Sequence, residues 1–164
     1  MGKMKNFLIK IKSNQFFRLL KNFSLYLLNR YFKSRKIFSS KSEVNFVVES
    51  ANWAIKWDGI YISKSINKTH GRDIVQMSEI PITNSKNRVI HFASQYMWLD
   101  WEKLLPKNNK YIVSFFHGKE QDSPEVKEHI NKFLNSHNSI YKVITASSLV
   151  YKRLLNWGIP AKKL

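Results

Sequence analysis

The chain has 164 residues, which suits one domain with a substantial hydrophobic core. Its apolar fraction of 43% and aromatic fraction of 14% exclude a chain that is disordered throughout. Because the chain has no cysteine, structural disulfides and thiolate metal sites are also excluded, which fits a reducing compartment.

The formal net charge of +17 is concentrated at the amino terminus. Residues 1–42 hold 11 of the 28 lysines and arginines and none of the 11 acidic residues, so the rest of the chain has a net charge of only +6. Small polar residues gather at 34–43, where the apolar periodicity lapses. The sequence therefore predicts a basic extension over residues 1–42 and a folded domain over 43–164.

The basic extension has the pattern of an amphipathic helix, because Phe16, Leu20, Phe23, Leu27 and Tyr31 recur at helical spacing. No charge-free window approaches the roughly 20 residues of a membrane span, and basic residues interrupt any signal-peptide core. The pattern favours a helix lying on an anionic membrane surface. The residues expected to contact that surface are Lys10, Lys12, Phe16, Arg18, Leu20, Lys21, Phe23 and Leu27. The alternative is a helix that docks on the body of the protein or on a partner domain. No nucleic-acid motif is recognisable, so no such partner is expected.

The folded domain alternates strand-like and helix-like segments. Short apolar, β-branched runs lie at 44–50, 73–79, 88–94, 111–117 and 141–147. Helical periodicity appears at 123–136 and 148–158. This alternation predicts an α/β fold with a parallel sheet and helices on both faces. Residues 80–87 are too short for a helical crossover, so either an unusual loop joins the second and third runs or one run lies outside the sheet.

Ligands of such sheets bind outside the carboxyl ends of the strands. There the sequence places Glu49 to Trp53, Ser94, His117-Gly118 and Thr145 to Ser148. His91 lies inside an apolar run and is interpreted as a core histidine. No histidine and carboxylate spacing suggests a metal site.

Several stretches resemble the retaining family 4 (group 1) glycosyltransferases of the GT-B fold. The stretch "DGIYISKSINKTHGRDIV" (58–75) is similar to that family's opening βα unit, in which a glycine-rich loop precedes a helix. "FFHG" (115–118) resembles its fourth strand, which ends in an active-site histidine, and "KVITASSLVYKRLLNWGIPAKKL" (142–164) resembles the segment before the second domain. The resemblance covers residues 44–164 and implies a Rossmann-like domain.

The resemblance also implies site residues. His117 is expected to be catalytic by stabilising developing charge. Asp58 stands where the family has a loop glycine, so a sugar hydroxyl is a better partner for it than a diphosphate. Lys119 suits an anionic acceptor, with a solvated lysine as the alternative. In the loop after the first strand, Asn52 and Trp53 suit sugar binding by apolar stacking and hydroxyl recognition; the alternative is that Trp53 and Trp57 form the packed face of a helical turn. The residues expected to bind the acceptor or a sugar are Asn52, Trp53, Asp58, Gly59, Gly118, Lys119 and Ser147.

The function implied is the acceptor-side half of a glycosyltransferase at the cytoplasmic face of the membrane, acting on a glycan or lipid-linked acceptor. A nucleotide sugar is expected as substrate of the complete enzyme, with no bound cofactor. The family's second, donor-binding domain would follow "GIPAKKL", so this chain alone is expected to have little or no activity. The alternatives are a non-catalytic module that binds a membrane surface and an inactive fragment.

Overall fold

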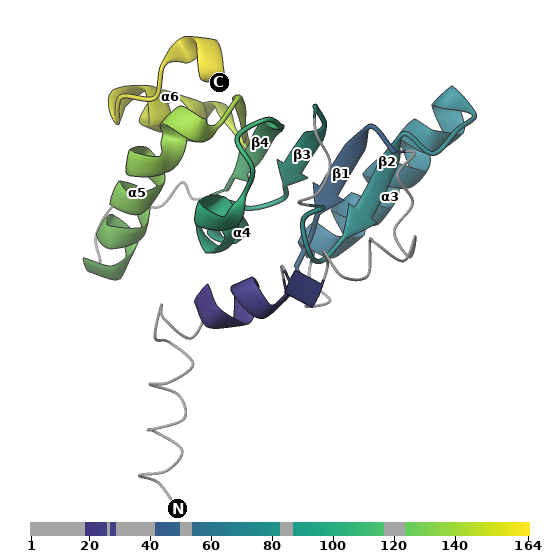
Figure 1. The fold of residues 1–164 in the computed structure, drawn as a ribbon. Helices are drawn as coiled ribbons and strands as arrows, with labels where there is room; N and C mark the ends of the chain where they lie inside the picture. Colours follow the sequence, from purple (N-terminus) through teal and green to yellow (C-terminus); the bar gives the residue numbers. More distant parts are fainter. Residues whose placement is uncertain (1–18, 26, 29–41, 50–53, 83–86, 117–123) are drawn as a thin grey trace, which may run out of the picture.

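The protein folds around one five-stranded parallel sheet flanked by helices (Figure 1). The structure is a computed structural model that describes residues 19–25, 27, 28, 42–49, 54–82, 87–116 and 124–164. The strands are β1 (Val44–Val47), β2 (Val75–Ser78), β3 (Val89–Phe92), β4 (Lys110–Phe115) and β5 (Lys142–Thr145), in the spatial order β2-β1-β3-β4-β5. All five apolar runs are thus confirmed as strands, and the predicted α/β, Rossmann-like architecture is confirmed.

The helices follow the predicted alternation. They are α3 (Ala54–His70), α4 (Gln95–Trp101), α5 (Pro124–Ser136) and α6 (Ser148–Asn156), with short 3₁₀ turns at Glu102–Leu104, His137–Ser139 and Ala161–Lys163. Ser94 and Ser147 begin α4 and α6, because each hydroxyl accepts a hydrogen bond from a backbone N–H in the first helical turn.

The connection between β2 and β3 has no helix among its described residues. Both strands pair in parallel with β1, one on each side, so the unusual-loop alternative is the correct one. The side chain of Asn45 holds this connection. It accepts a hydrogen bond from the Ile82 N–H at 2.9 Å and donates to the Ser78 hydroxyl at 2.8 Å. The buried side-chain amide of Asn45 therefore holds this connection against the sheet by hydrogen bonds, whereas helix packing holds the other crossovers.

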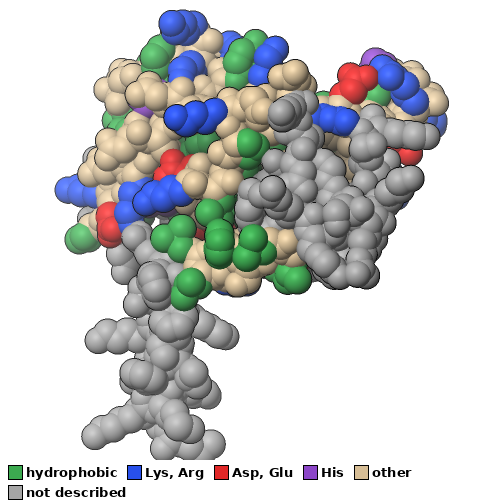
Figure 2. Space-filling view, in the orientation of Figure 1, with side chains coloured by type: hydrophobic (Ala, Val, Ile, Leu, Met, Phe, Trp, Pro, Cys, Tyr) green, Lys and Arg blue, Asp and Glu red, His purple; other side chains and the backbone are tan. Residues whose placement is uncertain are grey.

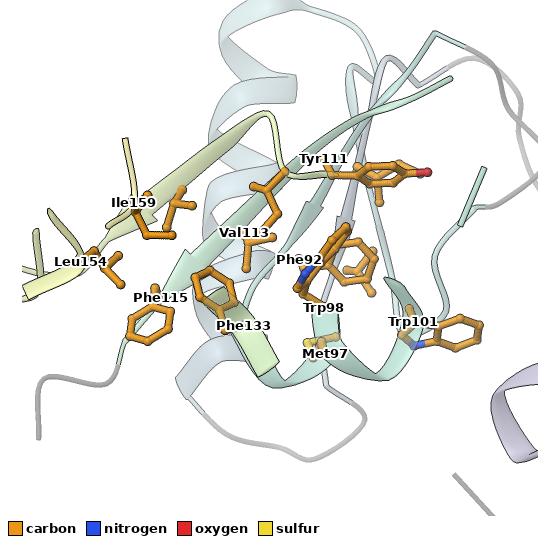
Figure 3. Packing of buried hydrophobic residues seen from close by; sticks show 14 of the residues in the cluster. Phe92, Met97, Trp98, Trp101, Tyr111, Val113, Phe115, Phe133, Leu154 and Ile159 are labelled. Carbon is orange, nitrogen blue, oxygen red and sulfur yellow. The ribbon is translucent and has the colours of Figure 1, made fainter. Parts of the chain in front are cut away.

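One face of the sheet carries the main hydrophobic core. Helices α4, α5 and α6 pack on this face, which we call the covered face (Figure 1). Figure 3 shows its aromatic centre, where the Phe115 and Phe133 rings lie 4.8 Å apart and the Phe92 and Trp98 rings 5.7 Å apart. The Trp98 indole N–H also donates to the Ser136 hydroxyl at 2.8 Å, so its one polar group is satisfied.

The opposite face is covered by α3 over β1 and β2 (Figure 1). The contact is close because Gly59 faces the sheet: a Cβ built at Gly59 would lie 2.7 Å from Val48 Cγ1. This corrects the expected placement of Asp58 and Gly59. Both residues lie inside α3 and not in a loop that precedes a helix. The missing side chain of Gly59 serves helix-to-sheet packing, and its amide does not stand at a helix start.

The described part of the basic extension is helical at residues 19–25, 27 and 28. It docks on the domain through Asn22, whose side chain donates to the Asp100 carbonyl at 2.7 Å, and through Leu25, which packs against the main core. Leu20 and Leu27 on the predicted apolar face remain 45% and 48% exposed. In Figure 2 hydrophobic side chains gather low on the surface, where this helix lies in Figure 1. The predicted boundary at 34–43 lies mostly outside the described residues.

Candidate functional site

Several predicted site residues lie outside the described part of the chain. These are the catalytic candidate His117 with Gly118 and Lys119, the acceptor-binding or sugar-binding candidates Asn52 and Trp53, and the extension residues Lys10, Lys12, Phe16 and Arg18. Their predicted roles stay predictions. The described residues that flank them define two adjoining features, one at the carboxyl edge of the sheet and one beneath α3.

The carboxyl edge brings together polar side chains that follow β1 and β3, and a backbone N–H that follows β4. We call Glu49, Ser94 and Gln95 the edge cluster. The Ser94 hydroxyl donates to Glu49 Oε1 at 3.4 Å, and Gln95 Oε1 accepts from the Phe116 N–H at 3.4 Å. The strand order changes direction between β1 and β3, and this is the position where doubly wound sheets bind their ligands.

Gln95 is the residue at this edge that sequence reasoning missed. Its side chain is buried, with the residue 1% exposed, yet Nε2 has no hydrogen-bond partner among the residues that the structure describes. A buried donor without a partner costs about 1–3 kcal/mol, so such a group needs an explanation. A buried donor of this kind beside the carboxyl edge is a candidate contact for a ligand atom. The available sequence signal was its position directly after Ser94, the predicted end of the third strand.

The second feature is a cavity of about 320 Å³ beneath α3, which we call the α3 pocket. Strands β1, β3, β4 and β5 form its floor and far wall, and the amino-terminal half of α3 forms its near wall. The described residues that line it are Phe46, Ile55, Asp58, Tyr61, Ile62, His91, Ala93, Ser114, Phe116 and Ile144.

His91 stands in the floor of the α3 pocket. Its Nε2 and the Ser114 hydroxyl lie 2.9 Å apart, and the Phe46 ring packs edge-on at 4.6 Å. Burial lowers the pKa of His91 to about 4, because desolvation disfavours the imidazolium. The ring is therefore neutral at pH 7. His91 is hydrogen-bonded, as predicted for a core histidine, but it also borders a cavity, which the sequence did not indicate.

The remaining predicted residues have defined surroundings. Asp58 is exposed and stands at the wall of the α3 pocket, where its carboxylate can accept a ligand hydroxyl. Gly59 is buried against the sheet and does not line the pocket. Ser147 is exposed, and its hydroxyl caps α6. Lys21 is exposed on the basic extension.

The described residues contain no group of three or more metal-ligating side chains close enough to hold a metal ion. Among the helices that the structure describes, none is long and apolar enough to cross a membrane.

No protein-family model, curated protein or solved structure matches the chain.

Proposed function

We propose that this chain is the acceptor-side half of a glycosyltransferase that works at an anionic membrane surface. The observation that carries the proposal is the edge cluster. A carboxylate and a hydroxyl hydrogen-bonded to each other, and a buried amide whose Nε2 has no partner among the described residues, follow the carboxyl ends of β1 and β3, at the reversal of strand order. This set suits a polyhydroxylated ligand, because carboxylates accept from sugar hydroxyls and amides donate to them. The resemblance of residues 44–164 to the glycosyltransferase family supports the same function.

In this proposal the edge cluster orients the acceptor. Glu49 accepts a hydrogen bond from an acceptor hydroxyl, and Gln95 Nε2 donates one to a second oxygen of the sugar. Holding the acceptor in a fixed pose lowers the entropic part of the barrier to transfer. His117 stabilises charge as the bond to the donor breaks. The donor, a nucleotide sugar, binds mainly to a second domain, which also stabilises the leaving diphosphate.

The basic extension supplies the membrane contact. Leu20 and Leu27 are about half exposed beside the exposed Lys21, which is the combination that an interfacial helix presents to anionic lipid. On the docked side Asn22 fixes this helix to α4, and Leu25 packs against the main core. A sugar acceptor carried by a membrane lipid would thereby be held near the carboxyl edge.

The test measures binding of uncharged sugars to residues 1–164. Methyl glycosides of the common hexoses and N-acetylhexosamines are the probes, and NMR chemical shifts report their binding. Glu49→Gln is expected to weaken binding about tenfold or more, because a hydrogen bond to a charged acceptor is lost. Glu43→Gln is the matched control, since Glu43 lies at the amino end of the same strand and pairs with Arg72 at the surface. A change within about twofold is expected there. A folded chain that binds none of these glycosides, or equal effects of the two substitutions, would overturn the proposal.

A second measurement separates the transferase from a membrane-binding module. The chain is sedimented with phosphatidylglycerol vesicles and, in parallel, with phosphatidylcholine vesicles. The proposal expects binding to the anionic vesicles together with glycoside binding. Vesicle binding without glycoside binding favours the non-catalytic module.

A further inference from the structure

The α3 pocket is a second binding feature, on the sheet face that α3 covers only in part. We infer that it binds the apolar body of an uncharged, hydroxyl-bearing ligand. Its assignment to the hydrocarbon part of a lipid-linked acceptor rests on the proposed function, whereas the chemistry of the ligand follows from the pocket alone.

The wall of the pocket is mainly apolar. Phe46 and Ala93 form a buried floor, whereas the rim is exposed: Tyr61, Ile62, Phe116 and Ile144 are 66%, 41%, 44% and 48% exposed. Exposed apolar side chains gathered around a cavity indicate a binding surface. The volume of about 320 Å³ lies at the lower end of the roughly 300–1,000 Å³ of small-molecule sites. The pocket therefore holds a short chain or a single ring.

The floor also carries one polar pair, Ser114 and His91. One hydrogen bond joins Nε2 and the hydroxyl at 2.9 Å, and with either tautomer of the ring the pair keeps one further donor and at least one further acceptor. A ligand hydroxyl can meet either of them. Since His91 is neutral at pH 7, the pair offers no positive charge to an anion.

The charged residues that line the α3 pocket further restrict the class of ligand that it can bind. Asp58 is the one acidic residue among the described lining residues, and no lysine or arginine lines the pocket among them. A phosphate or carboxylate ligand would meet a like charge and no counter-charge, which disfavours it. The diphosphate of a lipid carrier or of a nucleotide sugar therefore belongs elsewhere. An uncharged alcohol with an apolar body fits each of these features.

The pocket adjoins the edge cluster through Phe116. The Phe116 side chain lines the pocket, and its backbone N–H donates to Gln95 Oε1. Ala93 likewise lines the pocket directly before Ser94. A ligand with a sugar and an apolar chain can therefore place one part at each feature.

The probes are hexan-1-ol, heptan-1-ol and octan-1-ol, titrated into the ¹⁵N-labelled full chain. Saturable shifts are expected at the amides of Ser114 and Ile144. The Kd should fall about fourfold for each added methylene, the factor that corresponds to about 0.8 kcal/mol per buried CH₂. Octyl phosphate should bind at least about tenfold more weakly than octan-1-ol.

Two substitutions test the location. Ile144→Glu brings a carboxylate to the rim and should weaken octan-1-ol binding about tenfold or more. Its matched control is Leu149→Glu, a similarly exposed position on α6, where binding should change less than about twofold. Ser114→Ala removes the hydroxyl and should weaken binding about fivefold. Circular dichroism checks that each variant is folded.

Three outcomes would overturn the inference: alkanols that do not saturate, equal weakening by Ile144→Glu and Leu149→Glu, and octyl phosphate that binds as well as octan-1-ol. Sedimentation velocity gives a fourth, a dimer that Ile144→Glu dissociates, which would make this face an interface between two copies. Because alkanols carry no sugar, these results stand apart from the glycoside test. If glycosides bind and alkanols do not, the proposed function stands and only the inference about the α3 pocket is rejected.

Discussion

The two faces of the sheet differ in how completely helices cover them. On the covered face fifteen buried residues of the described part of the chain form one cluster with α4, α5 and α6. On the opposite face four of the described residues, Phe46, Val48, Val75 and Ala93, form a buried cluster beneath α3. The rest of that face leads into the α3 pocket and ends at Ile144, which is about half exposed. One face thus stabilises the fold, whereas the other, which we call the open face, leaves apolar surface exposed around the α3 pocket.

The strongest test of this comparison substitutes one apolar residue on each face. Phe133 is fully buried against Phe115, so Phe133→Ala should lower the free energy of unfolding by about 3–5 kcal/mol. Ile144→Ala should lower it by less than about 1 kcal/mol, because the residue is already half exposed. Urea denaturation monitored by circular dichroism measures both. Similar losses for the two variants would mean that the β4–β5 side of the open face is covered.

A second test uses pH, because the open face contains His91, whose pKa is lowered by its partial burial. His91 has a folded-state pKa of about 4 against the ordinary 6.5, so below pH 6.5 the unfolded chain takes up a proton that the folded chain does not. The free energy of unfolding should therefore fall as pH decreases from about 6.5 to about 4. The loss attributable to this group is on the order of 2–3 kcal/mol.

The control for this test is His91→Gln, which keeps a hydrogen-bonding group in the floor but does not titrate. Its free energy of unfolding should depend less on pH between 6.5 and 4 than that of the unsubstituted chain, since all other histidines and carboxylates are unchanged. If the free energy of unfolding depends on pH in the same way for both proteins, the imidazole of His91 is well solvated. The floor of the α3 pocket would then be wetter than its burial indicates.

The sequence predicted the sheet well, because buried parallel strands are short apolar runs with β-branched residues, and this signal is local. All five runs became strands. The sequence could not show whether a loop joins β2 to β3 directly or whether one of these runs lies outside the sheet. It depends on the Asn45 side chain reaching Ile82, a contact between residues 37 positions apart. A contact of that kind leaves no periodic pattern in the sequence.

The pocket could not be predicted for a related reason. An apolar stripe shows that α6 packs on the sheet, but it does not show on which face. Val150 and Leu154 of α6 join the cluster on the covered face, so the opposite face beside Ile144 stays open. The edge cluster was only partly predicted: Glu49 and Ser94 were expected at strand ends, whereas the burial of Gln95 depends on packing of the whole edge.

The smallest expected effect concerns the part of the open face that α3 does cover. Gly59→Ala places a Cβ 2.7 Å from Val48 Cγ1, and the resulting overpacking costs about 1–3 kcal/mol. The better helix propensity of alanine offsets about 1 kcal/mol, so a net loss of about 1 kcal/mol is expected from thermal or urea unfolding. Ser63→Ala in the same helix is the control, with a change within about 0.5 kcal/mol. A stabilising Gly59→Ala would show that α3 stands away from the sheet. A loss would show that α3 is held tightly beside the pocket, so that the near wall formed by Asp58 and Tyr61 is already in place before a ligand arrives.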